Sequence, residues 1–136
     1  MAAYNKFQSF VEALSEKVHN LGSDTLKVAL TNTAPVATNT RLSDITEISY
    51  TNCSDRTVAV TSSAQTSGTY KLVVSDLVLT ATGGSVGPFR YVVLYNDTAT
   101  NDELIAWYDR GSSVTLESTE TLTIDFDGTN GIFTLA

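Results

Sequence analysis

The sequence predicts a mainly β protein, an antiparallel β-sandwich or barrel-like jelly roll with one N-terminal amphipathic α-helix. Apolar residues recur at helical spacing only near the N-terminus. Beyond residue 22, short alternating runs of apolar and polar residues follow at intervals of about 8–12 residues, with turn-forming residues between them. We therefore expect a single domain over residues 1–136, with the helix in 1–22 and the β-sandwich in 23–136.

The N-terminal helix is predicted from one apolar stripe and from signals at its two ends. The stripe consists of Phe7, Phe10, Val11, Leu14, Val18 and Leu21. Asn5 and Gln8 form a capping-box pattern at the start, and Gly22 stands where a left-handed C-terminal residue belongs. Together these signals predict a helix of about four turns.

An apolar stripe of this kind has to be buried against another surface. Burial over an open edge of the same sandwich is the favoured alternative, and burial against a neighbouring subunit is the other. In the second case, the residues that we expect to contact the neighbour are Phe7, Phe10, Val11, Leu14 and Val18.

The rest of the chain is divided into short strands by its period and its turn residues. The predicted strands cover 26–30, 56–61, 70–79, 89–95, 104–108, 114–116, 122–126 and 132–135. A slip of phase at Ser75–Asp76 predicts a β-bulge. We expect a short helical turn at 42–48, a polar turn at 62–68, and hairpins that turn at 96–102 and at 127–131.

An aromatic ladder lies in the strand predicted over 89–95. Strict alternation places one set of side chains on one face, namely Phe89, Tyr91, Val93 and Tyr95. The other face carries Val92 and Leu94, so both faces are apolar. That pattern favours a buried central strand over a solvent-facing ligand platform, and we interpret Trp107 in the same way.

The charge distribution argues against two classes of partner. The net charge is −7, and the eight Lys and Arg residues are scattered singly along the chain. Nucleic-acid binding needs clustered basic residues, so we expect no nucleic-acid partner and no membrane partner. No apolar run approaches the ~20 residues of a membrane span, and the N-terminus lacks the apolar core of a signal peptide, so we expect synthesis in a cytoplasm.

We expect no catalytic residues and no cofactor. His19 is the only histidine, and no Cys or Ser signature of a triad or zinc site accompanies it. Cys53 is the only cysteine, which excludes a disulfide within the chain, and its context is not that of a redox pair. The carboxylates Asp102, Glu103 and Asp109 are interpreted as surface charge near a turn.

A calcium site is considered at the turn predicted over 127–131. Asp125, Asp127 and Asn130 place oxygen ligands at spacings that resemble the first half of a calcium loop. The later acidic ligand is missing, and Asp-Gly and Asn-Gly also favour a hairpin for conformational reasons. The turn interpretation is favoured, so we expect no metal here, and these three residues are the calcium candidate.

Seven phrases along the chain carry a family resemblance. They are the opening helix at 7–14, SDTLKVALTNTAP at 23–35, LSDITEI at 42–48, GTYKL at 68–72, GPFRY at 87–91, LYND at 94–97 and DFDG at 125–128. Together they resemble a family of small proteins encoded among the virion structural genes of tailed bacteriophages. The resemblance covers nearly the whole chain, although the region 50–55 lacks the Gly-rich loop that we associate with relatives.

The resemblance implies a non-enzymatic virion structural protein, with a capsid decoration (cement) protein as the leading assignment. Such a protein binds the outside of the capsid and stabilises it, which implies the major capsid protein or other virion proteins as partners. The implied location is the virion, assembled in the cytoplasm of the host bacterium. We also expect a homo-oligomer, and a trimer would suit a local three-fold site on the shell.

Two alternatives to the decoration role stay open at this point. A tail, neck or baseplate component would share the fold class. A carbohydrate-binding or receptor-binding module would use Trp107, Tyr108 and Tyr95 as stacking surfaces.

Overall fold

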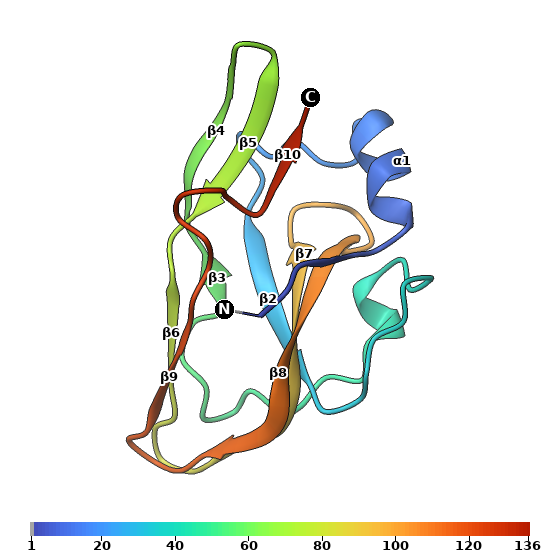
Figure 1. Cartoon of the computed structure of the whole chain (residues 1–136). Coiled ribbons are helices and arrows are strands. Elements are labelled where there is room, and N and C mark those ends of the chain that lie inside the picture. Colours follow the sequence, from blue (N-terminus) through green and yellow to red (C-terminus); the bar gives the residue numbers. More distant parts are fainter. Residues whose placement is uncertain (1) are drawn as a thin grey trace.

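The computed structural model describes residues 2–136 and shows two packed β layers with one short α-helix (Figure 1). Its elements are β1 (Asn5–Lys6), α1 (Ser9–Ser15), β2 (Leu26–Thr31), the 3-10 helix η1 (Leu42–Asp44), β3 (Thr57–Val58), β4 (Val60–Thr66), β5 (Thr69–Val74), β6 (Leu77–Thr80), β7 (Val86–Asn96), β8 (Leu104–Leu116), β9 (Thr121–Ile124) and β10 (Phe133–Leu135). All strand pairs are antiparallel. The prediction of a mainly antiparallel β fold with an N-terminal helix is confirmed.

The first layer is a five-stranded sheet in the order β1-β8-β7-β2-β3. Its central strand β7 pairs with β2 over six residues and with β8 on its other side. Both faces of β7 are covered, because Val92 and Leu94 belong to one buried cluster and Val93 and Tyr95 to another. Burial on both faces explains the near-continuous apolar run of this strand.

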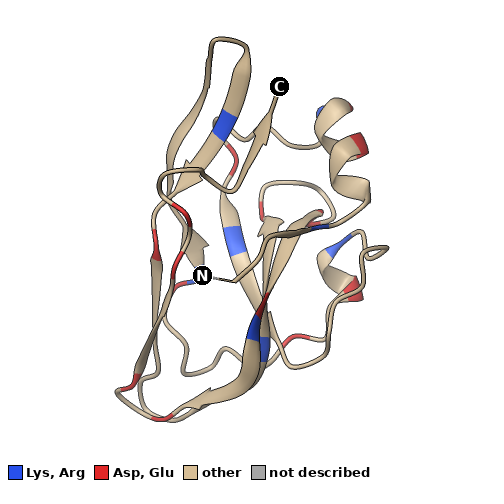
Figure 2. Cartoon of the chain, viewed as in Figure 1, with Lys and Arg blue, Asp and Glu red and all other residues tan. Residues whose placement is uncertain are grey.

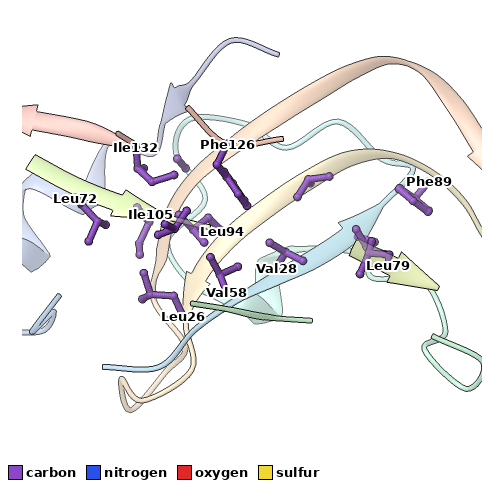
Figure 3. Packing of buried hydrophobic residues seen from close by; sticks show 14 of the residues in the cluster. Leu26, Val28, Val58, Leu72, Leu79, Phe89, Leu94, Ile105, Phe126 and Ile132 are labelled. Atoms are coloured by element: carbon purple, nitrogen blue, oxygen red, sulfur yellow. The ribbon is translucent and has the colours of Figure 1, made fainter. Parts of the chain in front are cut away.

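The second layer consists of a three-stranded sheet in the order β10-β5-β4 and a two-stranded ribbon of β6 and β9. The main core lies between the layers, where Leu72 and Phe126 of the second layer meet Leu94 and Ile105 of the first (Figure 3). Each layer is apolar on its inner face. Burying these side chains between the layers stabilises the fold by about 25 cal/mol per Å² of apolar surface removed from water.

The predicted bulge at Ser75–Asp76 is wrong, because the strand ends there. β5 stops at Val74 and pairs with β4 and β10, whereas β6 begins at Leu77 and pairs with β9. The Asp76 carboxylate holds the junction by accepting the backbone N–H of Phe126 at 2.9 Å. The slip of phase in the sequence therefore marks a change of partner strand, and the shift of register lies earlier, between Val60 and Ser62.

The predicted helix is too long. The observed helix α1 covers only seven residues. Asn5, which the sequence predicts as its cap, lies in β1 opposite Trp107 of β8. The N–H of Phe7 still donates to the Ile105 carbonyl oxygen at 3.2 Å, so the chain leaves the sheet only after Phe7. At the other end, Lys17 has a φ of 69°, which ends the helical path before Val18. Strand pairing at one end and a left-handed residue at the other thus shorten the helix.

The shortened helix also changes the prediction of a subunit contact. Phe7 and Phe10 are buried in their own chain, with 0% and 1% exposure, and are not available to a neighbour. Leu14 and Val18 are half-buried, and Val11 is 49% exposed. Of the five residues expected to contact a neighbouring subunit, only Val11 lies open on the surface.

Three further boundaries differ from the sequence prediction. Residues 62–66 belong to β4, so the polar turn is limited to Ser67 and Gly68. Residues 114–116 continue β8. The turn at 127–131 does not make a hairpin, because β9 pairs with β6 and β10 pairs with β5. The helical turn expected at 42–48 is present as η1, and the hairpin that turns at 96–102 joins β7 and β8.

Candidate functional site

The hairpin of β4 and β5, called the arm from here on, extends beyond the first sheet (Figure 1). Its two strands turn at Ser67 and Gly68, whose φ angles of 51° and 83° suit a two-residue hairpin loop. β10 pairs with the β5 side of the arm. The β4 side has no strand partner among residues 2–136, so β4 is a free edge.

The free edge is exposed and uncharged. Thr61, Ser62, Ala64, Gln65 and Thr66 are all exposed, and only Val60 and Ser63 of this strand are half-buried. Residues 57–70 contain no Asp, Glu, Lys or Arg. Figure 2 shows the arm in tan apart from one blue band on β5, the strand that contains Lys71, while acidic residues occur on many other elements. Natural proteins usually protect such an edge with charge, proline or a cover, and only the register shift at Thr61 interrupts this one.

A groove of about 1040 Å³ lies between the arm, the end of α1 and the β7–β8 loop. Tyr70 and Leu135 line it from the arm side, Leu14 from the helix, and Asn101 and Glu103 from the loop. The Tyr70 hydroxyl is 2.8 Å from Ser63 Oγ, and its ring lies 5.7 Å from the Phe133 ring. These contacts join the two strands of the arm to each other and to β10 beside the groove.

A buried polar network centred on Asn96 lies at this groove. The Asn96 Oδ1 atom accepts the backbone N–H groups of Thr98 and Ala99 at 2.9 and 3.2 Å, which fixes the orientation of the amide. Its Nδ2 group therefore donates, to Asp24 Oδ2 at 2.7 Å and to His19 Nδ1 at 3.0 Å. Since Nδ1 accepts a hydrogen bond, His19 is neutral and carries its proton on Nε2.

His19 is only 5% exposed, and its Nε2 atom has no hydrogen-bond partner among the described residues. Burial lowers the pKa of His19, although the nearby carboxylates of Glu103 and Asp24 act in the opposite direction. Protonation would also set an Nδ1–H against the fixed Asn96 amide donor. The native state is therefore built for a neutral imidazole.

His19 predicts a loss of stability in mild acid. Its pKa is lowered in the folded chain, so the unfolded chain takes up the proton first as the pH falls below about 6.5. The contribution of neutral His19 to the free energy of unfolding is complete above that pH and is lost as the pH falls toward the pKa of His19 in the folded chain. The slope is at most about 1.4 kcal/mol per pH unit. Urea unfolding at pH 7.5, 6.5 and 5.5 measures this change in the free energy of unfolding.

The matched variant for this measurement is His19→Gln, which replaces the imidazole with an uncharged amide of similar reach and removes the titrating group. It should flatten the pH dependence between 7.5 and 5.5 relative to the unaltered protein. Asp102, whose pKa is raised by burial, is retained in both proteins, so its contribution cancels in the comparison. Equal slopes in the two proteins would contradict the assignment to His19.

The calcium candidate forms a turn whose polar atoms bond to one another. Asp127 Oδ1 accepts the N–H groups of Thr129 and Asn130 at 2.9 and 2.8 Å, and its Oδ2 accepts the Asn130 amide at 2.8 Å. Asp125 lies exposed at the end of β9. Over residues 2–136 there is no group of three or more His, Cys, Asp or Glu side chains placed to hold a metal ion.

The aromatic side chains that a stacking surface would use, Tyr95, Trp107 and Tyr108, lie in or against the core. Tyr95 is 2% exposed, Trp107 packs on the Phe7 ring at 4.7 Å between centroids, and Tyr108 packs on Phe126 at 5.9 Å. The expectation that Phe89 shares a face with Tyr95 is wrong. Register shifts between positions 89 and 91 turn Phe89 into the main core cluster, whereas Tyr95 lies in the second cluster.

The remaining candidate groups are separate from one another. Cys53 forms an isolated bridge with Ala81, and burial raises the pKa of its thiol. Asp109 binds Arg90 through two bonds of 2.8 and 3.0 Å, and these hydrogen bonds lower the pKa of Asp109. These groups are not brought together with Glu103, which lies at the groove.

Sequence reasoning missed the two features that stand out in the structure. The sequence predicts a polar turn where the free edge of β4 lies, because a polar stretch such as 62–66 gives no hydrophobic period. The Ser67–Gly68 pair was the only signal of a hairpin tip. The network of Asn96, Asp24 and His19 joins residues 72 and 77 positions apart, which no local pattern reveals.

Fold and site together define a two-layer antiparallel β protein with a projecting arm and a free, neutral strand edge. Comparison with family models, with curated proteins and with solved structures finds no match for this chain. In the part of the chain that the structure describes, no helix has the length and apolar character needed to cross a membrane.

Proposed function

We propose that the protein is a non-enzymatic bacteriophage virion structural protein that decorates the outside of the capsid and stabilises it. The family resemblance of the sequence suggests the virion. The observation that carries the proposal is the exposed, uncharged edge of β4 on a body closed by a buried core. A rigid body with an unfinished sheet edge suits a protein that works by contact with neighbouring subunits.

The physical logic of the role is multivalency. A shell presents many equivalent sites, so a homo-oligomer that binds two or more of them gains affinity without any new kind of contact. The proposed partners are the major capsid protein or other virion proteins, and the proposed location is the virion assembled in the host cytoplasm. The acidic surface, with a net charge of −7, suits a contact with less acidic subunits.

The test is to locate the chain on intact particles of the phage that encodes it. We expect antibody label or assigned density over the whole capsid surface, in many copies per head. Particles that lack the protein should release DNA at a lower temperature than complete particles, and adding the purified protein should restore the difference.

Each other outcome has a clear meaning for the proposal. Label confined to the tail, neck or baseplate would contradict the decoration role and favour the other virion assignment. A chain absent from purified particles would contradict both. Antibody binding to disrupted particles serves as the control that the epitope is accessible to the label.

A further inference from the structure

We propose that the protein forms a two-fold dimer in which β4 pairs antiparallel with β4 of a second copy. This inference specifies the homo-oligomer within the proposed function, but it rests on the geometry of the arm and is tested on the purified protein alone. The paired arms would form one sheet of six strands, in the order β10-β5-β4-β4-β5-β10, where the second three belong to the partner copy.

The first step is the state of the strand edge. In an antiparallel hairpin, half of the backbone N–H and C=O groups of an outer strand point away from its partner. β4 pairs with β5 from Ser62 to Thr66 without a shift of register, so it is straight over five residues beyond the shift at Thr61. No strand among residues 2–136 covers this side. Backbone groups in this arrangement are a template for another strand.

The second step is the choice of partner, which the charge distribution decides. Each copy carries a net charge of −7, so two copies repel wherever acidic surfaces meet. The arm avoids this repulsion, since residues 57–70 are uncharged. A partner recognised through basic residues would instead meet no carboxylate on this edge. A neutral strand on an acidic protein is therefore compatible with a second copy of itself.

The third step is the fit of the strand to itself. A two-fold axis beside Ser63 places Ser62 opposite Ala64 of the second copy, and Ala64 opposite Ser62, within the straight part of the strand. All of these side chains are small or polar and, apart from Ser63, exposed, so none clashes or loses a charge partner on pairing. Ser63 stays bonded to Tyr70 within its own arm at 2.8 Å. Because the arm projects from the body, antiparallel pairing directs the two bodies away from each other (Figure 1).

The symmetry of this contact fixes the size of the assembly. An isologous edge-to-edge contact uses the same surface on both copies and closes after two. The inferred assembly is therefore a dimer and not the trimer expected from a three-fold site on a shell.

The experiment compares two variants that differ at one position. Ser62→Glu with Ala64→Glu places introduced glutamates opposite each other across the two-fold axis, twice per dimer. Ser62→Lys with Ala64→Glu places opposite charges there instead. Both variants put the same glutamate opposite Lys71 on β5, which favours the hairpin in each case. Sedimentation velocity over a range of concentrations measures the dimer dissociation constant.

We expect the unaltered protein and the Lys/Glu variant to be dimers, and the Glu/Glu variant to dissociate at a concentration at least about tenfold higher. Thr38→Glu with Thr46→Glu is the control for net charge. Both positions are exposed and remote from the arm in the chain, so this variant should dimerise like the unaltered protein. Thermal unfolding by circular dichroism checks that all variants are folded.

Three results would overturn the inference. They are a monomer at all concentrations, a trimer, or equal dissociation constants for the Glu/Glu and Lys/Glu variants. The outcome is separate from that of the particle experiment. If the protein is a monomer and labels the capsid, the dimer inference is wrong and the proposed function stands. If the protein is a dimer but is absent from particles, the dimer inference stands and the proposed function is wrong.

Discussion

Replacing Phe10 with alanine is expected to lower the free energy of unfolding by about 3–5 kcal/mol. The Phe10 ring is 1% exposed and is the one residue of α1 that is fully buried. It stacks edge-on against Phe133 of β10 at 5.2 Å and lies 5.4 Å from the His19 ring. Its removal would leave a cavity where the helix, β10 and the polar network meet.

Chemical denaturation at pH 7.5 measures this effect. Val11→Ala is the matched control, because Val11 follows Phe10 on the same helix but is 49% exposed. It should cost less than about 0.5 kcal/mol. Similar losses for the two variants would mean that the helix does not dock on the core through Phe10.

Replacing Gly131 with alanine is the second change with a large expected effect, about 2–4 kcal/mol. Gly131 has a φ of 78°, a conformation that costs other residues about 1–2 kcal/mol. A Cβ atom would also overlap the Leu72 carbonyl oxygen, which accepts the N–H of Ile132 at 2.7 Å. The backbone at Gly131 cannot move away from Leu72 without lengthening this hydrogen bond and weakening the pairing of β10 with β5.

The control for this prediction is Gly128→Ala in the same turn. A Cβ atom at Gly128 meets nothing within 4 Å, so this change should alter stability by less than about 0.5 kcal/mol. Thermal and urea unfolding of both variants give the comparison. Hydrogen exchange in β10 should rise in the Gly131 variant, and unchanged exchange there would contradict the reason given for the loss.

The elements that could be predicted from the sequence are those with a clear hydrophobic period and turn residues at their ends. β2, the centre of β7 and the start of β8 alternate or run apolar, and the hairpin between β7 and β8 has a loop rich in turn formers. The helix was recognised for its type but not for its length. Its first predicted turn pairs with β8 instead, because backbone bonds to a neighbouring strand outweigh a local capping pattern.

The errors share one physical cause, which is that pairing partners are not encoded locally. The slip at Ser75–Asp76 is visible in the sequence, but only the tertiary structure shows that β5 and β6 pair with different strands. The turn at 127–131 has the residues of a hairpin, yet the strands on either side of it belong to different partners. The free edge of β4 could not be predicted for the same reason, since it is defined by the absence of a partner strand beside it.

The strand pairings also govern when the chain can fold. β1 pairs with a strand about a hundred positions later, with Asn5 opposite Trp107. β10 pairs with β5 in the middle of the sequence, with Leu135 opposite Tyr70. Closing such long loops costs entropy before any contact rewards it, which makes β proteins of this kind fold in about milliseconds to seconds. The five-stranded sheet cannot be completed on the ribosome before β8 has emerged, nor the three-stranded sheet before β10, so each layer forms only after its last strand has been synthesised.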